Sequence, residues 1–95
     1  MNPTLRQQTA LLVRTREGRT RLAVWTQWQA RGRMRTEIVV WRVVRTLLPR
    51  DQIAHQIEKR ALDVEYRDLE AWFQAHDFEL LGRLDGPSIE EPLSS

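Results

Sequence analysis

Between residues 10 and 28 the chain changes from apolar to polar and back to apolar, and it reads ALLVRTREGRTRLAVWTQW. Two apolar runs flank a polar stretch centred on Glu17 and Gly18, and glycine readily adopts the positive φ of a tight turn. Threonine, which favours strands, recurs on both sides of this stretch. The pattern predicts a β-hairpin in which residues 10–16 pair with residues 19–28.

The segment EIVVWRVV, residues 37–44, is nearly continuous in apolar character and rich in β-branched side chains. Such a run is typical of a strand with both faces covered. A helix over residues 36–48 is the alternative, because four residues share one helical stripe. These are Ile38, Trp41, Arg45 and Leu48. The strand is favoured, because β-branched side chains lose conformational freedom in a helix. A turn at Gly32 then completes a three-stranded antiparallel meander.

Between residues 49 and 76 the apolar positions change to helical spacing. Pro49 suits the first position of a helix, and Asp51 suits the first turn, where the helix dipole favours an anion. Apolar residues then recur at intervals of three or four. They are Ile53, Ile57, Ala61, Val64, Leu69, Trp72 and Phe73, with His76 on the same stripe. The spacing predicts one long helix, or two helices over residues 50–62 and 64–76 with Asp63 as the second N-cap.

Together these elements predict an α+β fold, in which one or two helices pack on one face of the three-stranded antiparallel meander. Residues 78–84, FELLGRL, are compatible with a short C-terminal edge strand. Residues 1–9 are expected to be a poorly ordered leader or a short helix, residues 10–84 a single domain, and residues 85–95 a flexible acidic tail. The predicted core consists of Leu12, Leu22, Val24, Ile38, Val40, Ile53, Ile57, Val64, Leu69, Trp72, Phe73 and Leu80.

The length of 95 residues and the absence of cysteine narrow the functional classes. A chain of this size suits one domain with a modest core, and without cysteine it has neither a disulfide framework nor a thiolate metal site. No apolar run approaches the roughly 20 residues that a membrane-spanning helix needs. A cytoplasmic protein that does not enter a membrane is therefore expected.

Candidate catalytic residues are few. His55 and His76 are not spaced as metal ligands, and His76 is expected to be a core-edge residue bonded to a backbone carbonyl. The four glycines are isolated, so they form no phosphate-binding loop, and no serine lies in a nucleophile motif. The sequence therefore predicts a protein that is not an enzyme and needs no metal or cofactor.

Charge is distributed unevenly along the chain. Residues 1–50 carry eleven arginines and two acids, a net charge of +9, whereas residues 51–95 carry a net charge of −7. Such asymmetry between halves indicates an anionic partner for the basic half. The alternative is that the two halves pack together and neutralise each other.

Arginines around the predicted hairpin point to nucleic acid. A turn centred on residues 17–18 would place Arg16 opposite Arg19 and Arg14 opposite Arg21, so four cations would crowd one face. Like charges that face each other destabilise a sheet, which suggests that an anion holds them. A second cluster in the next turn, Arg31, Arg33 and Arg35, is expected to extend this surface to six to eight phosphate contacts.

Tryptophans near these arginines suggest a stacking surface for bases. Trp25, Trp28 and Trp41 are the candidates, and Trp25 and Trp28 are favoured because they lie nearest the arginines of the hairpin and the next turn. Side chains three residues apart point to opposite faces of a regular strand, so Trp25 and Trp28 are not expected to share one surface. The main hypothesis is therefore a small protein that binds DNA or RNA. The alternative is a protein-interaction module, such as an accessory subunit, an inhibitor or an immunity-type protein. Its partner would be a second copy of the chain or an acidic protein.

Overall fold

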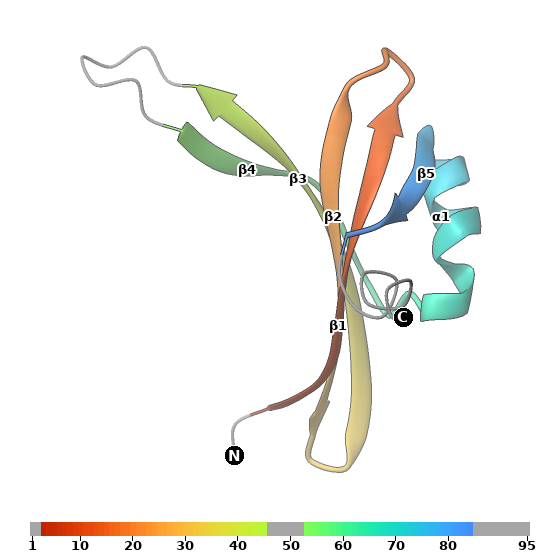
Figure 1. Ribbon diagram of the computed structural model, residues 1–95. Coiled ribbons are helices and arrows are strands. Elements are labelled where there is room, and N and C mark those ends of the chain that lie inside the picture. Colours follow the sequence, from red (N-terminus) through yellow and green to blue (C-terminus); the bar gives the residue numbers. More distant parts are fainter. Residues whose placement is uncertain (1–2, 46–52, 85–95) are drawn as a thin grey trace, which may run out of the picture.

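The structure, a computed structural model, describes residues 3–45 and 53–84. These residues form an α+β fold with one antiparallel sheet and one short helix (Figure 1). The elements are β1 (Thr4–Thr15), β2 (Thr20–Ala30), β3 (Arg33–Arg45), β4 (Ile53–Leu62), a 3-10 turn (Tyr66–Asp68), α1 (Leu69–Ala75) and β5 (Phe78–Arg83). The sheet order is β4-β3-β2-β1-β5, so a meander of four strands is extended by β5 at the edge of β1.

The first three strands and both glycine turns confirm the sequence prediction. Gly18 has a φ of 91° and Gly32 a φ of 74°, in the region that glycine adopts most easily. The C-terminal edge strand is also confirmed, because β5 pairs antiparallel with β1. Residues 4–9, expected to be a leader, instead extend β1 and pair with the far end of β2.

The register of the first hairpin differs from the predicted one. Arg14 faces Thr20, and Val13 faces Arg21. The connection between β1 and β2 contains four residues instead of two, and Thr15 donates its N–H to the carbonyl of Arg19 over 2.7 Å. This shifts the pairing by one position. Because side chains alternate between faces, Arg14 and Arg21 consequently lie on opposite faces of the sheet.

The predicted helix over residues 50–62 is wrong where the structure describes it, because residues 53–62 form β4. Spacings of four fit one stripe of a helix, but they are also even numbers and fit one face of a strand. A β-bulge at Glu58 then breaks that face, because Val40 pairs with Lys59 whereas Trp41 pairs with Ile57. The expected helix start at Pro49 and Asp51 and the expected acidic tail lie outside the described residues.

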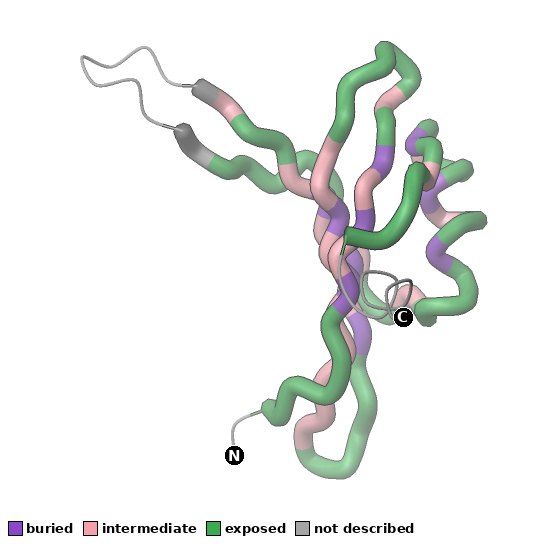
Figure 2. Tube along the Cα trace, viewed as in Figure 1, coloured by how far each residue is buried: buried purple, intermediate pink, exposed green. Residues whose placement is uncertain are grey.

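The predicted second helix, over residues 64–76, is confirmed only in its later part, where α1 occupies residues 69–75. α1 covers one face of the sheet, and the core lies between them (Figures 1 and 2). The predicted core residues Ile38, Val40, Leu69 and Phe73 are buried, and Val64, Trp72 and Leu80 pack against the same cluster as partly buried residues. The other members of the buried cluster are Leu11, Val13, Ala23, Trp25 and Phe78.

Four residues of the predicted core lie elsewhere. Leu12, Leu22 and Val24 point to the opposite face of the sheet and are only partly buried. Ile57 pairs with Trp41 on that face and is 50% exposed. Both faces of β1 and β2 carry apolar side chains, so the pattern does not show which face the helix covers. The side chain of Ile53 lies outside the described part of the chain.

The face opposite α1 carries apolar rows beside polar side chains and is not covered by any helix that the structure describes. Cross-strand partners share a face, and they form apolar rows such as Leu12, Leu22, Trp41 and Ile57. We call this surface the open face; its apolar residues include Leu5, Leu12, Leu22, Val24, Trp28, Val39, Trp41, Val43, Ile57 and Leu62. An antiparallel sheet with one face in water usually carries polar side chains there, so this composition indicates a contact surface.

The hairpins diverge at the ends of the sheet. In Figure 1 the β1–β2 turn and the β2–β3 turn lie at opposite ends of the molecule, and the ends of β3 and β4 spread away from β1 and β2. Figure 2 shows burial concentrated in the middle of the sheet, while these ends are exposed. No helix in residues 3–45 or 53–84 is long and apolar enough to span a membrane.

Candidate nucleic-acid interface

Three of the four hairpin arginines are paired with carboxylates from the second half of the chain. Arg14 contacts Glu79 at 2.6 Å, Arg16 contacts Asp77 at 2.7 Å, and Arg21 contacts Glu58 at 2.5 Å. The expected crowd of four unpaired cations on one face is therefore wrong. The two halves of the chain neutralise each other at these positions, as the alternative interpretation predicts.

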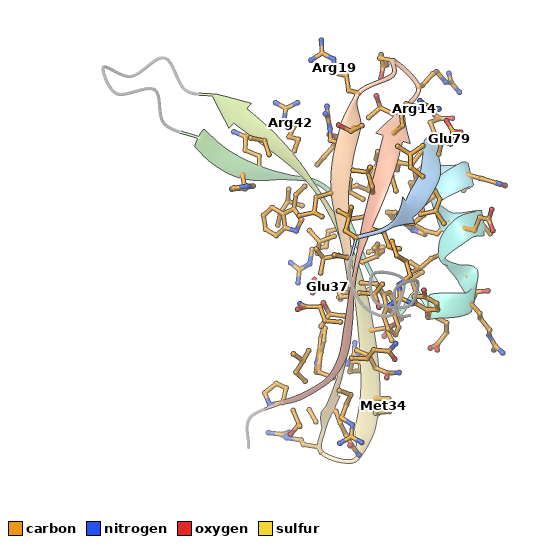
Figure 3. All side chains as sticks on the ribbon, in the orientation of Figure 1. Arg14, Arg19, Met34, Glu37, Arg42 and Glu79 are labelled. Atoms are coloured by element: carbon orange, nitrogen blue, oxygen red, sulfur yellow. The ribbon has the colours of Figure 1, made fainter. Side chains whose placement is uncertain are left out.

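The second arginine cluster does not extend the first one. Arg31, Arg33 and Arg35 lie at the β2–β3 end of the sheet, near Met34 in Figure 3, whereas Arg14 and Arg19 lie at the other end. The eleven residues of β2 separate the two ends by about 36 Å at the usual rise of a strand. Arg35 also contacts Asp63 at 3.3 Å. The nine predicted site residues therefore do not form one continuous surface.

Trp25 is not available for stacking on a base. Its side chain is in the core with 2% of the residue exposed, and its Nε1–H donates to the carbonyl of Val64 over 2.8 Å. Its ring also contacts the edge of Tyr66, with 5.2 Å between centroids. Trp28 is partly buried and faces the same side as the open face, between Leu5 and Arg35 on the neighbouring strands.

A cationic hollow lies where the β1–β2 hairpin and the β3–β4 hairpin diverge. Its volume is about 280 Å³, and its lining consists of Arg19, Arg21, Arg42, Val43 and Val44. We call the three arginines the arginine notch. Arg21 precedes Leu22 and Arg42 follows Trp41, so the two arginines lie at one level on adjacent strands, one position beyond the cross-strand pair of Leu22 and Trp41. Figure 3 shows Arg42 on β3 and Arg19 near the tip of the neighbouring hairpin.

Arg21 is the fixed member of the notch. Its Nε donates to Glu58, its Nη1 donates to the carbonyl of Thr20 over 3.0 Å, and its side chain is 15% exposed. Glu58 is the extra residue of the β-bulge in β4, and bulges commonly redirect a side chain. Within the part of the chain that the structure describes, Arg19 and Arg42 have no carboxylate partner. The notch thus holds three cations against one anion.

A second hollow adjoins the notch on the side of the open face. It measures about 240 Å³ and is lined by Leu12, Thr20, Arg21, Leu22, Trp41 and Val43. Arg21 and Val43 therefore belong to both hollows. An arginine surface and a partly exposed tryptophan meet at this point.

A larger hollow, of about 580 Å³, is less suited to an anion. It lies beside β5 and α1 and contains Arg14 and Arg16 together with three carboxylates, Glu70, Asp77 and Glu79. Arg14 is paired with Glu79, and Arg16 is paired with Asp77. A phosphate group there would meet net negative charge, whereas the arginine notch offers net positive charge.

The prediction for His76 is confirmed. Its Nδ1 lies 2.8 Å from the carbonyl oxygen of Trp72, and its ring packs on the ring of Trp72 at 4.3 Å between centroids. His55 is exposed on β4. Across the described ranges, no group of three or more histidine and acidic side chains is arranged to hold a metal ion.

The sequence does not single out Arg42 as a site residue, because nothing local distinguishes it from the other residues of its apolar run. Trp41 is one of the three tryptophans that the sequence offers for stacking. Comparison of the chain with protein-family models, with curated proteins and with solved structures found no match. The candidate function therefore rests on the geometry of these two hollows and of the open face.

Proposed function

We propose that the protein is a non-enzymatic nucleic-acid-binding protein that holds phosphates of the backbone in the arginine notch. The observation that carries this proposal is the placement of Arg19, Arg21 and Arg42 around one hollow with Glu58 as the paired acid. Guanidinium groups are planar forks that match the oxygens of a phosphate, and they keep their charge at any physiological pH. Two of the three are exposed residues whose charge a ligand could neutralise.

The proposed phosphate-binding surface is smaller than the one predicted from the sequence. Two or three phosphate contacts replace the six to eight expected from the arginine count. For a single strand, two contacts give a slope of about −1.4 and three give about −2 when the logarithm of affinity is plotted against the logarithm of salt concentration. Binding is therefore expected to be moderate and to be sensitive to ionic strength.

Charge reversal tests the notch. In the double variant Arg19→Glu and Arg42→Glu, affinity for a labelled oligonucleotide should fall by at least about tenfold at low salt, because two phosphate contacts become repulsive. The salt slope should become shallower by about 1.4. Fluorescence anisotropy over a salt series measures both quantities.

The control carries the same change in net charge at the opposite end of the sheet. In the double variant Arg31→Glu and Arg33→Glu, affinity should remain within about twofold of the wild type, since that turn is distant from the notch. Equal losses in both variants would mean that net charge governs binding, and the proposed site would then be wrong.

The open face favours a second candidate, a protein-interaction module whose partner is a second copy of the chain. Charged side chains on this face are paired within the molecule, Glu37 with Arg60 and Arg14 with Glu79. A face whose charges are already paired brings no net charge into an interface with an identical face, and its apolar rows supply the favourable burial. Trp41 belongs both to this face and to the second hollow, so the two candidates compete for it.

A lysine at Ile57 tests this candidate. If the open face forms a dimer, Ile57→Lys should shift the protein from dimer to monomer in analytical ultracentrifugation, because it would bury an unpaired charge in the interface. Met34→Lys is the matched control: Met34 is 49% exposed, close to the 50% of Ile57, and its strand position points to the other face. A monomeric wild type, or an equal effect of both lysines, would exclude a dimer through this face.

A further inference from the structure

The two hollows that meet at Arg21 and Val43 differ in chemistry. The notch is lined by three guanidinium groups, whereas the second hollow is lined by Leu12, Leu22 and Trp41, with Thr20 and Arg21 as its polar residues. A ligand that occupies both must carry anionic groups next to a flat apolar group. Nucleic acid has this combination, because each phosphate is one sugar away from a base.

We infer that Trp41 is a base-stacking residue and that the protein binds single-stranded nucleic acid in preference to duplex. This inference rests on the proposed function, because it needs phosphates in the arginine notch. It adds the class of nucleic acid and a contact that the arginines do not supply. Stacking on an aromatic ring is tolerant of sequence, since every base presents a flat π-face.

Geometry explains the preference for single strands. Inside a duplex, both faces of each base are covered by the neighbouring bases, and only the edges are accessible in the grooves. A base in a single strand can be turned away from its neighbours and laid on a protein ring. The Trp41 hollow is bounded by the side chains of Leu12 and Leu22, which would contact the apolar face of such a base.

Arg21 connects the two parts of the site. It lines both hollows and is held in place by Glu58 and by the carbonyl of Thr20. Arg21 and Arg42 point to the side of the sheet that α1 covers, whereas Trp41 points to the open face. A nucleic-acid strand with a phosphate beside Arg42 and Arg19 therefore reaches Trp41 by passing between the diverging hairpins, where Arg21 and Val43 line both hollows. Trp28 has no such arrangement: its cross-strand neighbours are Leu5 and Arg35, and Arg35 is paired with Asp63.

The test compares a 12-nucleotide single strand with the duplex of the same sequence, using anisotropy for affinity and tryptophan fluorescence for stacking. We expect the wild type to bind the single strand more tightly. Trp41→Leu should weaken single-strand binding by about 5- to 150-fold, the effect of removing one stacking ring. The salt slope should not change, because the phosphate contacts remain. Trp41→Phe should retain most of the affinity, and Trp28→Leu should behave like the wild type.

Each outcome separates this inference from the function on which it rests. One outcome is that Trp41→Leu binds as well as the wild type while the double variant Arg19→Glu and Arg42→Glu binds more weakly. In that case the arginine notch holds phosphate and the stacking role of Trp41 is wrong. If the wild type binds duplex as tightly as single strand, the inferred preference is wrong. If Trp41→Leu and Trp41→Phe lose affinity equally and their salt slope also falls, Trp41 supports the fold and does not stack. Absence of binding to either oligonucleotide by the wild type contradicts the proposed function itself.

Discussion

Replacing Phe73 by alanine should lower the free energy of unfolding by about 3–5 kcal/mol, a large part of the 5–15 kcal/mol typical of a whole domain. Phe73 is completely buried, and its ring contacts Phe78 edge-on with 6.4 Å between centroids. α1 has seven residues, too few to be stable without tertiary contacts. Phe73 and Leu69 are its two buried residues, so the loss of one should release α1 from the sheet.

Urea denaturation monitored by tryptophan fluorescence measures this effect, because Trp25 lies in the same core. Leu81→Ala is the control: it removes apolar atoms from β5 at a position that is 40% exposed, and it should cost less than about 1 kcal/mol. The exposure of sheet surface after Phe73→Ala should also increase the hydrogen exchange of β5. Equal midpoints for the two variants would show that α1 does not stabilise the sheet.

The strands of the first half could be predicted because their signals are local. Glycine marks each turn, and residues 37–44 combine apolar character with β-branching, which a helix disfavours. The short helix could also be anticipated, since Leu69, Trp72, Phe73 and His76 are spaced three, one and three apart, which no strand face can reproduce.

β4 could not be predicted in the same way. Its apolar residues Ile53, Ile57 and Ala61 are four apart, a spacing that is shared by the helical and strand periods. The β-bulge at Glu58 then puts Ile57 and Ala61 on different faces, because Ile57 pairs with Trp41 and Ala61 with Ile38. Only the pairing of β4 with β3, which is a tertiary contact, distinguishes the two structures.

The sequence also does not determine which face of the sheet α1 covers. Leu12, Leu22 and Val24 form a consistent apolar set, and so do Leu11, Ala23 and Trp25 on the other side. The choice depends on where α1 packs, which is decided by the chain after β4. A sheet that carries apolar side chains on both faces can be packed against on both. In the described residues α1 packs against one face, and the other is the open face.

The site was harder to predict than the fold, because charge in a sequence does not show which charges are paired. The excess of arginine in residues 1–50 is real, but Arg14, Arg16, Arg21 and Arg35 each meet an acid from the second half. The one-residue shift in the first hairpin also separated arginines that the predicted register had brought together. Arg42 lies beside Arg19 and Arg21 because β2 pairs with β3 and the two hairpins then diverge. Both features are tertiary, so the local sequence does not indicate them.

Neutralising Glu58 should affect stability and binding in opposite directions. In Glu58→Gln, Arg21 loses the carboxylate that its Nε contacts at 2.5 Å, while its side chain stays 15% exposed. The lost charge-assisted hydrogen bond should lower the free energy of unfolding by about 1–3 kcal/mol. The same change leaves the notch with three cations and no paired acid. Affinity for a single strand at low salt should therefore rise by about three- to tenfold, and the salt slope should steepen by about 0.7.

Glu37→Gln separates this local effect from the change in net charge. Glu37 has 17% side-chain exposure and pairs with Arg60 on the open face, so the substitution removes one negative charge from a similar ion pair outside the notch. Its stability loss should be comparable, but its affinity for nucleic acid should stay within about twofold of the wild type. A rise in affinity in both variants would assign the effect to net charge. A rise in affinity in Glu58→Gln alone assigns the effect to the notch, and a steeper salt slope in the same variant would show that Arg21 itself meets a phosphate.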